Sequence, residues 1–212
     1  MVSKAAYAPD SPSRAGTLDL VAGALALDFA NTASGRGGPQ HLEHLREPAD
    51  VLTWAEHAGV IDARTAKRAA RALAAGAPRF LTLLEDALAL REAIYRIAAA
   101  LAEKRSPAEA DLALVKAACA RAIAAAELAP GPDGFRWRWP TDPPLPETIL
   151  GPLALSAAGL LREGDLSRIK QCAGEHCGWL FFDLTKNKSR RWCEMSACGN
   201  RAKAKRFAGK RG

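Results

Sequence analysis

Apolar and polar positions alternate along most of this chain with helical spacing. Between residues 80 and 101, apolar side chains recur at three- and four-residue steps, while Glu85, Glu92 and Arg96 occupy the other side. This spacing predicts a long helix with one face in a core. Shorter patterns predict helices over 48–59, 63–75 and 147–162. The most apolar stretch, 18–32, predicts a buried strand or helix that opens the fold.

A further helix is predicted to begin at Ser106-Pro107-Ala108-Glu109, which has the form of a capping box with proline at the first helical position. It should run to about residue 127. Its expected buried face consists of Leu112, Val115, Cys119 and Ile123.

A β-hairpin should follow, because the turn residues 130–134 (PGPDG) precede an alternating segment, 135–139 (FRWRW). Its aromatic side chains are expected on one face. Gly164 and Asp165 mark a domain boundary. We therefore expect a disordered N-terminus over 1–16, a helical domain over 17–164, and a small second domain over 165–212.

The second domain carries four cysteines with the spacing C-x4-C-x15-C-x4-C, namely Cys172, Cys177, Cys193 and Cys198. Each close pair can supply two thiolates from one turn, as a tetrahedral zinc site needs. About 45 residues bury too little apolar surface to fold alone, whereas zinc can stabilise such a segment. We expect one structural Zn²⁺ ion. Free or disulfide-bonded cysteines are the alternative, and His176 is an alternative ligand.

The segments 179–183 and 191–192 are expected to form the two arms of a hairpin, and the residues after Cys198 to form a helix. The second domain is therefore predicted to be a zinc-bound ββα unit. The whole chain is assigned to the mainly α class, with a small β-hairpin in its helical domain.

The excess of positive charge is confined to the second domain. Residues 168–212 hold 12 Lys or Arg and 3 acids, whereas the rest of the chain holds 18 basic and 20 acidic residues. This asymmetry predicts a polyanionic partner, double-stranded DNA being the leading candidate. The expected nucleic-acid-binding residues are Lys186, Lys188, Arg190, Arg191, Arg201, Lys203, Lys205 and Arg206.

Other functional classes find little support in the sequence. The N-terminus lacks the apolar run of a secretory signal, and no segment supplies the roughly 20 apolar residues of a membrane span. We therefore expect a cytoplasmic protein. No Ser-His-Asp set, phosphate-binding glycine loop or open three-ligand metal site is recognisable, so we do not expect an enzyme.

Residues 193–201 (CEMSACGNR) resemble the signature of the CGNR zinc-finger family, and residues 25–32 (LALDFANT) resemble the opening motif of the ABATE domain. The resemblance implies a mostly helical N-terminal domain, a zinc-binding C-terminal domain, and a stress-linked bacterial transcription regulator. It leaves open whether Arg201 contacts phosphate or braces the start of a helix.

The leading hypothesis is thus a DNA-binding regulator whose helical domain senses a ligand or forms a homodimer. Asp28 and Asn31 could line a ligand pocket, or they could cap and turn the end of a buried element. An RNA- or ribosome-associated zinc protein is the alternative function.

Overall fold

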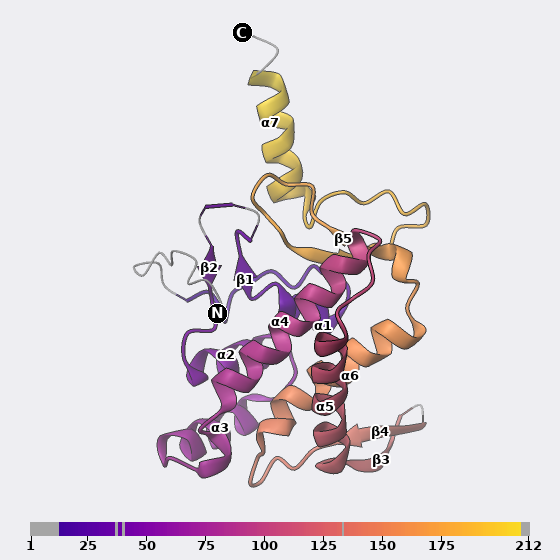
Figure 1. Cartoon of the computed structure of the whole chain (residues 1–212). Helices are drawn as coiled ribbons and strands as arrows, with labels where there is room; N and C mark the ends of the chain where they lie inside the picture. Colours follow the sequence, from indigo (N-terminus) through magenta and orange to yellow (C-terminus); the bar gives the residue numbers. More distant parts are fainter. Residues whose placement is uncertain (1–12, 37, 40, 133, 209–212) are drawn as a thin grey trace.

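The computed structural model describes residues 13–36, 38–39, 41–132 and 134–208. These residues form a helical body from which a short C-terminal helix projects (Figure 1). The expected mainly α class is confirmed. The helices of the body are α1 (Leu25–Ala30), α2 (Pro48–His57), α3 (Ala63–Ala74), α4 (Leu83–Ala102), α5 (Glu109–Ala124) and α6 (Pro146–Glu163).

Helix α4 lies at the centre of the body and packs against α1, α2, α5 and α6. Its apolar face is buried, as the periodicity of the sequence predicted. Phe29 and Trp54, which are fully buried, meet in the core with ring centroids 5.2 Å apart. The apolar stretch 18–32 forms the helix α1 rather than a strand, because Leu27, Phe29 and Ala30 can then all face the core.

The start and the buried face of α5 differ from the prediction. The helix begins at Glu109, its N-cap is Ala108, and no capping box forms. Asp111 turns inward because it accepts hydrogen bonds from Arg96 of α4 at 2.5–3.0 Å. Leu112 and Ile123 are consequently about two-fifths exposed. The residues that α5 buries are Asp111, Val115, Ala118 and Ala122.

Three two-stranded antiparallel ribbons complete the described residues. The predicted hairpin is present and pairs Leu128 with Trp137. Its Phe135 and Trp137 are exposed, so these aromatic side chains do not add to the core. The pairs are β1 (Ala33–Ser34) with β2 (Leu42–Glu43), β3 (Glu127–Gly131) with β4 (Gly134–Arg138), and β5 (Ile169–Gln171) with β6 (Leu180–Phe182).

The N-terminal segment 1–16 was expected to be disordered. Residues 1–12 lie outside the described residues, but Ser13 to Gly16 do not fit the expectation. Ser13 donates a hydrogen bond to the carbonyl of His44 at 2.8 Å, and Ala15 is 1% exposed in the core. The helical body therefore begins before residue 17.

The C-terminal part of the chain packs directly on the body. Leu180 and Phe181 of β6 are fully buried, and they share an apolar cluster with Leu27 of α1 and Ala98 of α4. A backbone hydrogen bond of 2.7 Å also joins the amide of Phe182 to the carbonyl of Ala22. The cysteine-bearing part is thus built against α1 and α4.

A buried ion-pair network holds the β1–β2 ribbon on the body. Arg91 of α4, which is 3% exposed, donates two hydrogen bonds of 2.6 Å to Glu43 of β2. Arg36 binds Glu92 through two hydrogen bonds, and its guanidinium lies 3.9 Å from the ring centroid of Tyr95. The β1–β2 ribbon faces the cysteine-bearing part of the chain, and the two enclose a cavity. The ion-pair network therefore fixes the wall of this cavity that the ribbon forms.

Candidate metal centre and nucleic-acid surface

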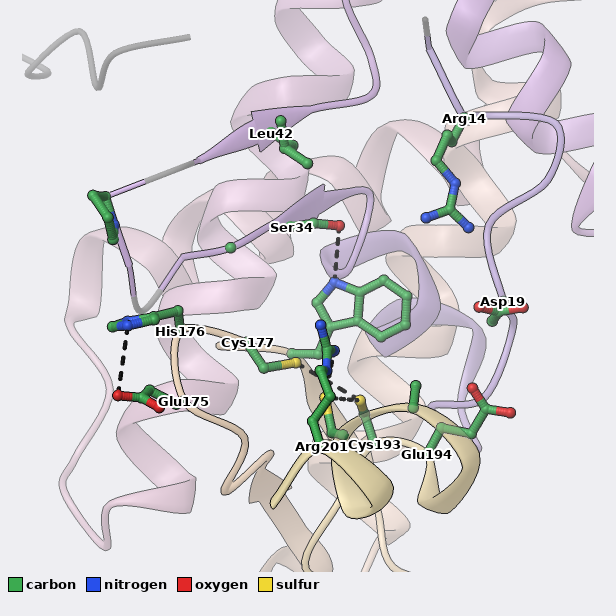
Figure 2. A pocket seen from close by; sticks show the side chains of 15 residues that line it. Arg14, Asp19, Ser34, Leu42, Glu175, His176, Cys177, Cys193, Glu194 and Arg201 are labelled. Atoms are coloured by element: carbon green, nitrogen blue, oxygen red, sulfur yellow. Dashed lines mark hydrogen bonds and ion pairs between the residues drawn. The ribbon is translucent and has the colours of Figure 1, made fainter. Parts of the chain in front are cut away.

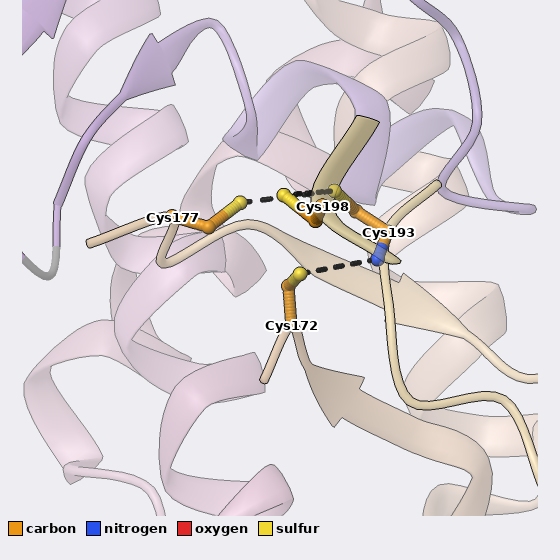
Figure 3. A group of neighbouring side chains, drawn as sticks. All are labelled: Cys172, Cys177, Cys193 and Cys198. Carbon is orange, nitrogen blue, oxygen red and sulfur yellow. Dashed lines mark hydrogen bonds between the residues drawn. The ribbon is translucent and has the colours of Figure 1, made fainter. Parts of the chain in front are cut away.

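Four short segments bring the cysteines of the C-terminal part together (Figure 3). Cys172 directly follows β5, and Cys177 lies in the turn that leads into β6. Cys193 ends the long loop after β6, and Cys198 lies in a single π-helical turn, Met195–Gly199. Helix α7 (Asn200–Ala208) continues from that turn. The two cysteines of each close pair therefore come together locally, Cys172 and Cys177 across one turn and Cys193 and Cys198 through the start of the π-helical turn, as the spacing predicted.

The distances between the sulfur atoms suit a metal ion. All four Sγ atoms lie within 4.8 Å of one another. The Sγ atoms of Cys177 and Cys193 are 3.7 Å apart, and those of Cys193 and Cys198 are 3.6 Å apart. A tetrahedral site with Zn–S bonds of about 2.3 Å requires edges of about 3.8 Å. Among the described residues no other such group of potential ligands occurs, and His176 is not part of it.

Hydrogen-bond donors surround the sulfur atoms, as is typical of a thiolate site. The backbone amides of Cys193 and Gly174 point at the Sγ of Cys172 at 3.2 and 3.4 Å, and Arg201 donates to the Sγ of Cys198 at 3.2 Å. A Cβ on Gly174 would lie 2.9 Å from the Sγ of Cys198, so this position has no room for a side chain.

Three of the thiols, those of Cys172, Cys177 and Cys193, compete for negative charge. Hydrogen bonds from Cys177, Cys193 and nearby amides lower the pKa of Cys172. The pKa values of Cys177 and Cys193 are raised, because each donates to a neighbouring sulfur and would add a like charge beside it. A divalent ion would remove this conflict, since thiolate ligands of a metal are held deprotonated.

The expected hairpin between the two cysteine pairs is wrong in its pairing. Residues 180–182 do form a strand, but β6 pairs with β5, which precedes Cys172. Residues 191–192 are not in a strand, and their backbone instead reaches the first pair, where the Ala173 amide donates to the Arg191 carbonyl at 2.9 Å. Pairing across the first turn brings Cys172 and Cys177 together, which the expected hairpin would not have done.

The loop between β6 and Cys193 is organised by a fully buried carboxylate that the sequence analysis missed. Asp183 accepts hydrogen bonds from Lys170 at 2.7 Å and from Thr185 and the Arg190 amide. Although burial acts to raise it, these donors hold the pKa of Asp183 below its usual range. The Asp-x-Thr sequence was the available signal, because an aspartate commonly binds the backbone two residues ahead.

Two of the predicted nucleic-acid-binding residues bind groups of the chain itself, although Arg190 is only half-buried and Arg201 is exposed. Arg190 stacks 4.3 Å from the ring of Phe181 and donates to the carbonyls of Trp192, Cys193 and Val21. Its bond to Val21 ties the loop to the helical body. Arg201 donates to the Sγ of Cys198, which is a contact that a brace would make, and its side chain remains exposed.

Two more predicted residues are engaged in exposed ion pairs. Lys188 lies 2.8 Å from Asp165, and Lys205 lies 2.5 Å from Glu175. Exposed ion pairs of this kind contribute little to stability. The remaining four are exposed, and the described residues offer their charged groups no hydrogen bond or ion pair: Lys186, Arg191, Lys203 and Arg206.

Helix α7 carries this positive charge away from the body, with its axis pointing outward (Figure 1). None of its residues is buried. A groove of about 630 Å³ runs beside it, between Trp192 and the first cysteine turn, and its basic lining is Arg191, Arg201, Lys205 and Arg206.

Asp28 and Asn31, the candidate ligand-binding residues, both bind the chain's own backbone. Asn31 is 3% exposed. Its side-chain Nδ2 donates to the carbonyl of Leu180 at 2.8 Å, and its Oδ1 accepts from the backbone amide of Leu180 at 2.9 Å. Asp28 accepts from the Ala22 amide at 2.9 Å, and burial raises its pKa to about 6. Asn31 thus holds β6, and Asp28 holds the loop before α1, so neither side chain caps the end of its own helix as the structural alternative expected.

The comparison with known families agrees with this architecture. Residues 23–164 match the ABATE family, described as "Putative stress-induced transcription regulator". The chain belongs to the ABATE family. Residues 168–211 match the CGNR zinc finger, so the C-terminal part of this ABATE protein is a zinc finger. No curated protein matches the chain.

None of the described helices of this ABATE protein is both long enough and apolar enough to cross a membrane.

Proposed function

We propose that this ABATE protein is a DNA-binding transcription regulator whose finger holds one Zn²⁺ ion through Cys172, Cys177, Cys193 and Cys198. The tetrahedral spacing of the four sulfur atoms supports the zinc assignment. Zinc supplies a structural cross-link there, and four cysteines leave no open position for a substrate.

The main support for DNA binding is the projecting helix α7. It presents Lys203 and Arg206 to solvent without internal partners, and Lys205 in an exposed ion pair. Arg191 and Lys186 add charge from the preceding loop. Contacts of this kind neutralise phosphates, position a protein on a duplex, and release counterions.

The role of each basic residue follows from its place in the finger. Arg190 and Arg201 bind groups of the finger itself, whereas Lys203 and Arg206 are exposed and free to meet the duplex. We therefore assign phosphate contact to the α7 residues. Sequence preference, where it exists, would come from groups other than Arg201.

The test uses the full zinc-loaded chain, with metal content measured by elemental analysis. One zinc per chain is expected, and fluorescence anisotropy should show tighter binding to a DNA duplex than to an RNA duplex of equal length. Tighter binding to RNA would favour the alternative of an RNA-associated protein. Absence of zinc from protein purified without chelator would refute the metal assignment.

A further inference from the structure

A cavity of about 490 Å³ lies where the helical body meets the zinc finger (Figure 2). Its lining comes from the N-terminal segment, the β1–β2 ribbon, and both cysteine turns. Small-molecule sites commonly occur between domains and have volumes of this size. The DNA-binding surface on α7 does not account for this cavity.

The apolar part of the lining is held in place. The indole N–H of Trp179 donates to the hydroxyl of Ser34 at 3.2 Å, and this bond fixes the ring between the finger and the ribbon. Leu42 of β2 adds a second apolar side chain. The cavity therefore offers a fixed aromatic surface to an apolar group of a ligand.

The charged part of the lining contains both signs, and three of its groups lack partners. The side chains of Arg14, Asp19 and Glu194 make no hydrogen bond or ion pair with any described residue. Figure 2 shows all three along one side of the cavity. The groove beside α7 is different, because its unpaired charges, on Arg191 and Arg206, are both basic.

We propose that this cavity binds a small zwitterion of the α-amino-acid class with an apolar side chain. A guanidinium such as that of Arg14 can pair with a carboxylate through two hydrogen bonds. Asp19 and Glu194 supply negative charge for an ammonium group, and Trp179 and Leu42 supply apolar surface for the side chain. A ligand with only one charge would leave one of these sets unpaired.

A ligand in this cavity would contact the zinc finger. Arg201 and Cys198 line both this cavity and the groove beside α7. An occupant would therefore touch the turn from which α7 begins. Binding of the amino acid is tested without DNA, so its failure would leave the proposed DNA binding untouched.

Isothermal titration calorimetry of the zinc-loaded full chain provides the test, with L-phenylalanine and L-leucine as probes. The matched controls are 2-phenylethylamine, which lacks the carboxylate, and 3-phenylpropanoate, which lacks the ammonium group. We expect saturable binding of at least one amino acid with a Kd below about 1 mM, and weaker binding of both controls.

Two substitutions locate the site. Arg14→Gln and Asp19→Asn should each weaken amino-acid binding by about tenfold, as loss of a charge-assisted contact does. Asp19→Asn should leave binding of 3-phenylpropanoate unchanged, and Arg14→Gln should leave that of 2-phenylethylamine unchanged. Lys116→Gln, an exposed change on α5, is the control. Absence of saturable binding of either amino acid, or binding that neither cavity variant weakens, would overturn the proposal.

Discussion

Individual arginines that look alike in the sequence have different roles in the structure. Arg190, Arg201 and Arg206 all belong to one basic segment, yet the first binds backbone carbonyls, the second binds a cysteine sulfur, and the third faces solvent. Charge and spacing alone could not separate them, because each role depends on contacts across the fold. The cysteines were predictable, since their ligand role depends on local spacing.

Arg201→Lys tests the brace. Lysine keeps the charge but lacks the planar donor group that reaches the Sγ of Cys198, so the metal should be held less firmly. We expect zinc transfer to a chromophoric chelator to become about tenfold faster, in line with other losses of a donor to a metal ligand.

Arg206→Lys is the control for this measurement, because Arg206 does not contact the cysteines. It should leave the transfer rate unchanged. If Arg201→Lys kept normal zinc transfer but altered the motif selected from a random DNA pool, Arg201 would read bases instead of bracing the finger.

Among the elements, the positions of the helices were easier to predict than the faces that they bury and the strands that pair with one another. The periodicity of α4 and the aspartate cap of α3, where Asp62 accepts from the Thr65 amide at 2.7 Å, are local signals. The buried face of α5 is decided by Arg96, which lies on another helix. The strand β5 was missed because its three residues acquire their structure only by pairing with β6.

Asn31→Ala tests how β6 is held on the body. The change removes both hydrogen bonds to the Leu180 backbone and leaves a buried amide and a buried carbonyl without partners. Each unsatisfied group costs about 1–3 kcal/mol, so the free energy of unfolding should fall by about 2 kcal/mol or more. Urea denaturation measures this loss.

Asn187→Ala provides the matched control, because Asn187 is exposed and, among the described residues, its side chain is hydrogen-bonded only to Ser189. Its effect should stay within about 0.5 kcal/mol, as is usual for surface substitutions. An equally small effect of Asn31→Ala would show that these two bonds do not hold β6 on α1.

At the scale of the whole molecule, the body and the finger share their packing. Leu27 and Ala98 lie in the same apolar cluster as Phe181 and three of the cysteines. The sequence indicated a domain boundary near Gly164, but it could not show this shared core, whose contacts join residues far apart in the chain. Loss of the metal should therefore affect the helices as well as the finger.

Removing zinc with a chelator, or by Cys193→Ser, should lower the unfolding temperature of the entire chain by roughly 10 °C or more. Far-UV circular dichroism and tryptophan fluorescence should report coincident transitions, as in two-state unfolding. Cys119→Ser, a change at the cysteine outside the metal cluster, should cause a much smaller shift. A helical body that keeps its original unfolding temperature would mean that the two parts fold independently.

The salt dependence of DNA binding tests whether α7 is the DNA-binding surface. For the zinc-loaded chain, the slope of log Kd against log salt concentration should fall by about two units in the double variant Lys203→Ala/Arg206→Ala, because two phosphate contacts are lost. Lys116→Ala, on the exposed side of α5, should leave the slope unchanged. An identical slope for the double variant and the unaltered chain would contradict the assignment of α7 as the DNA-binding surface.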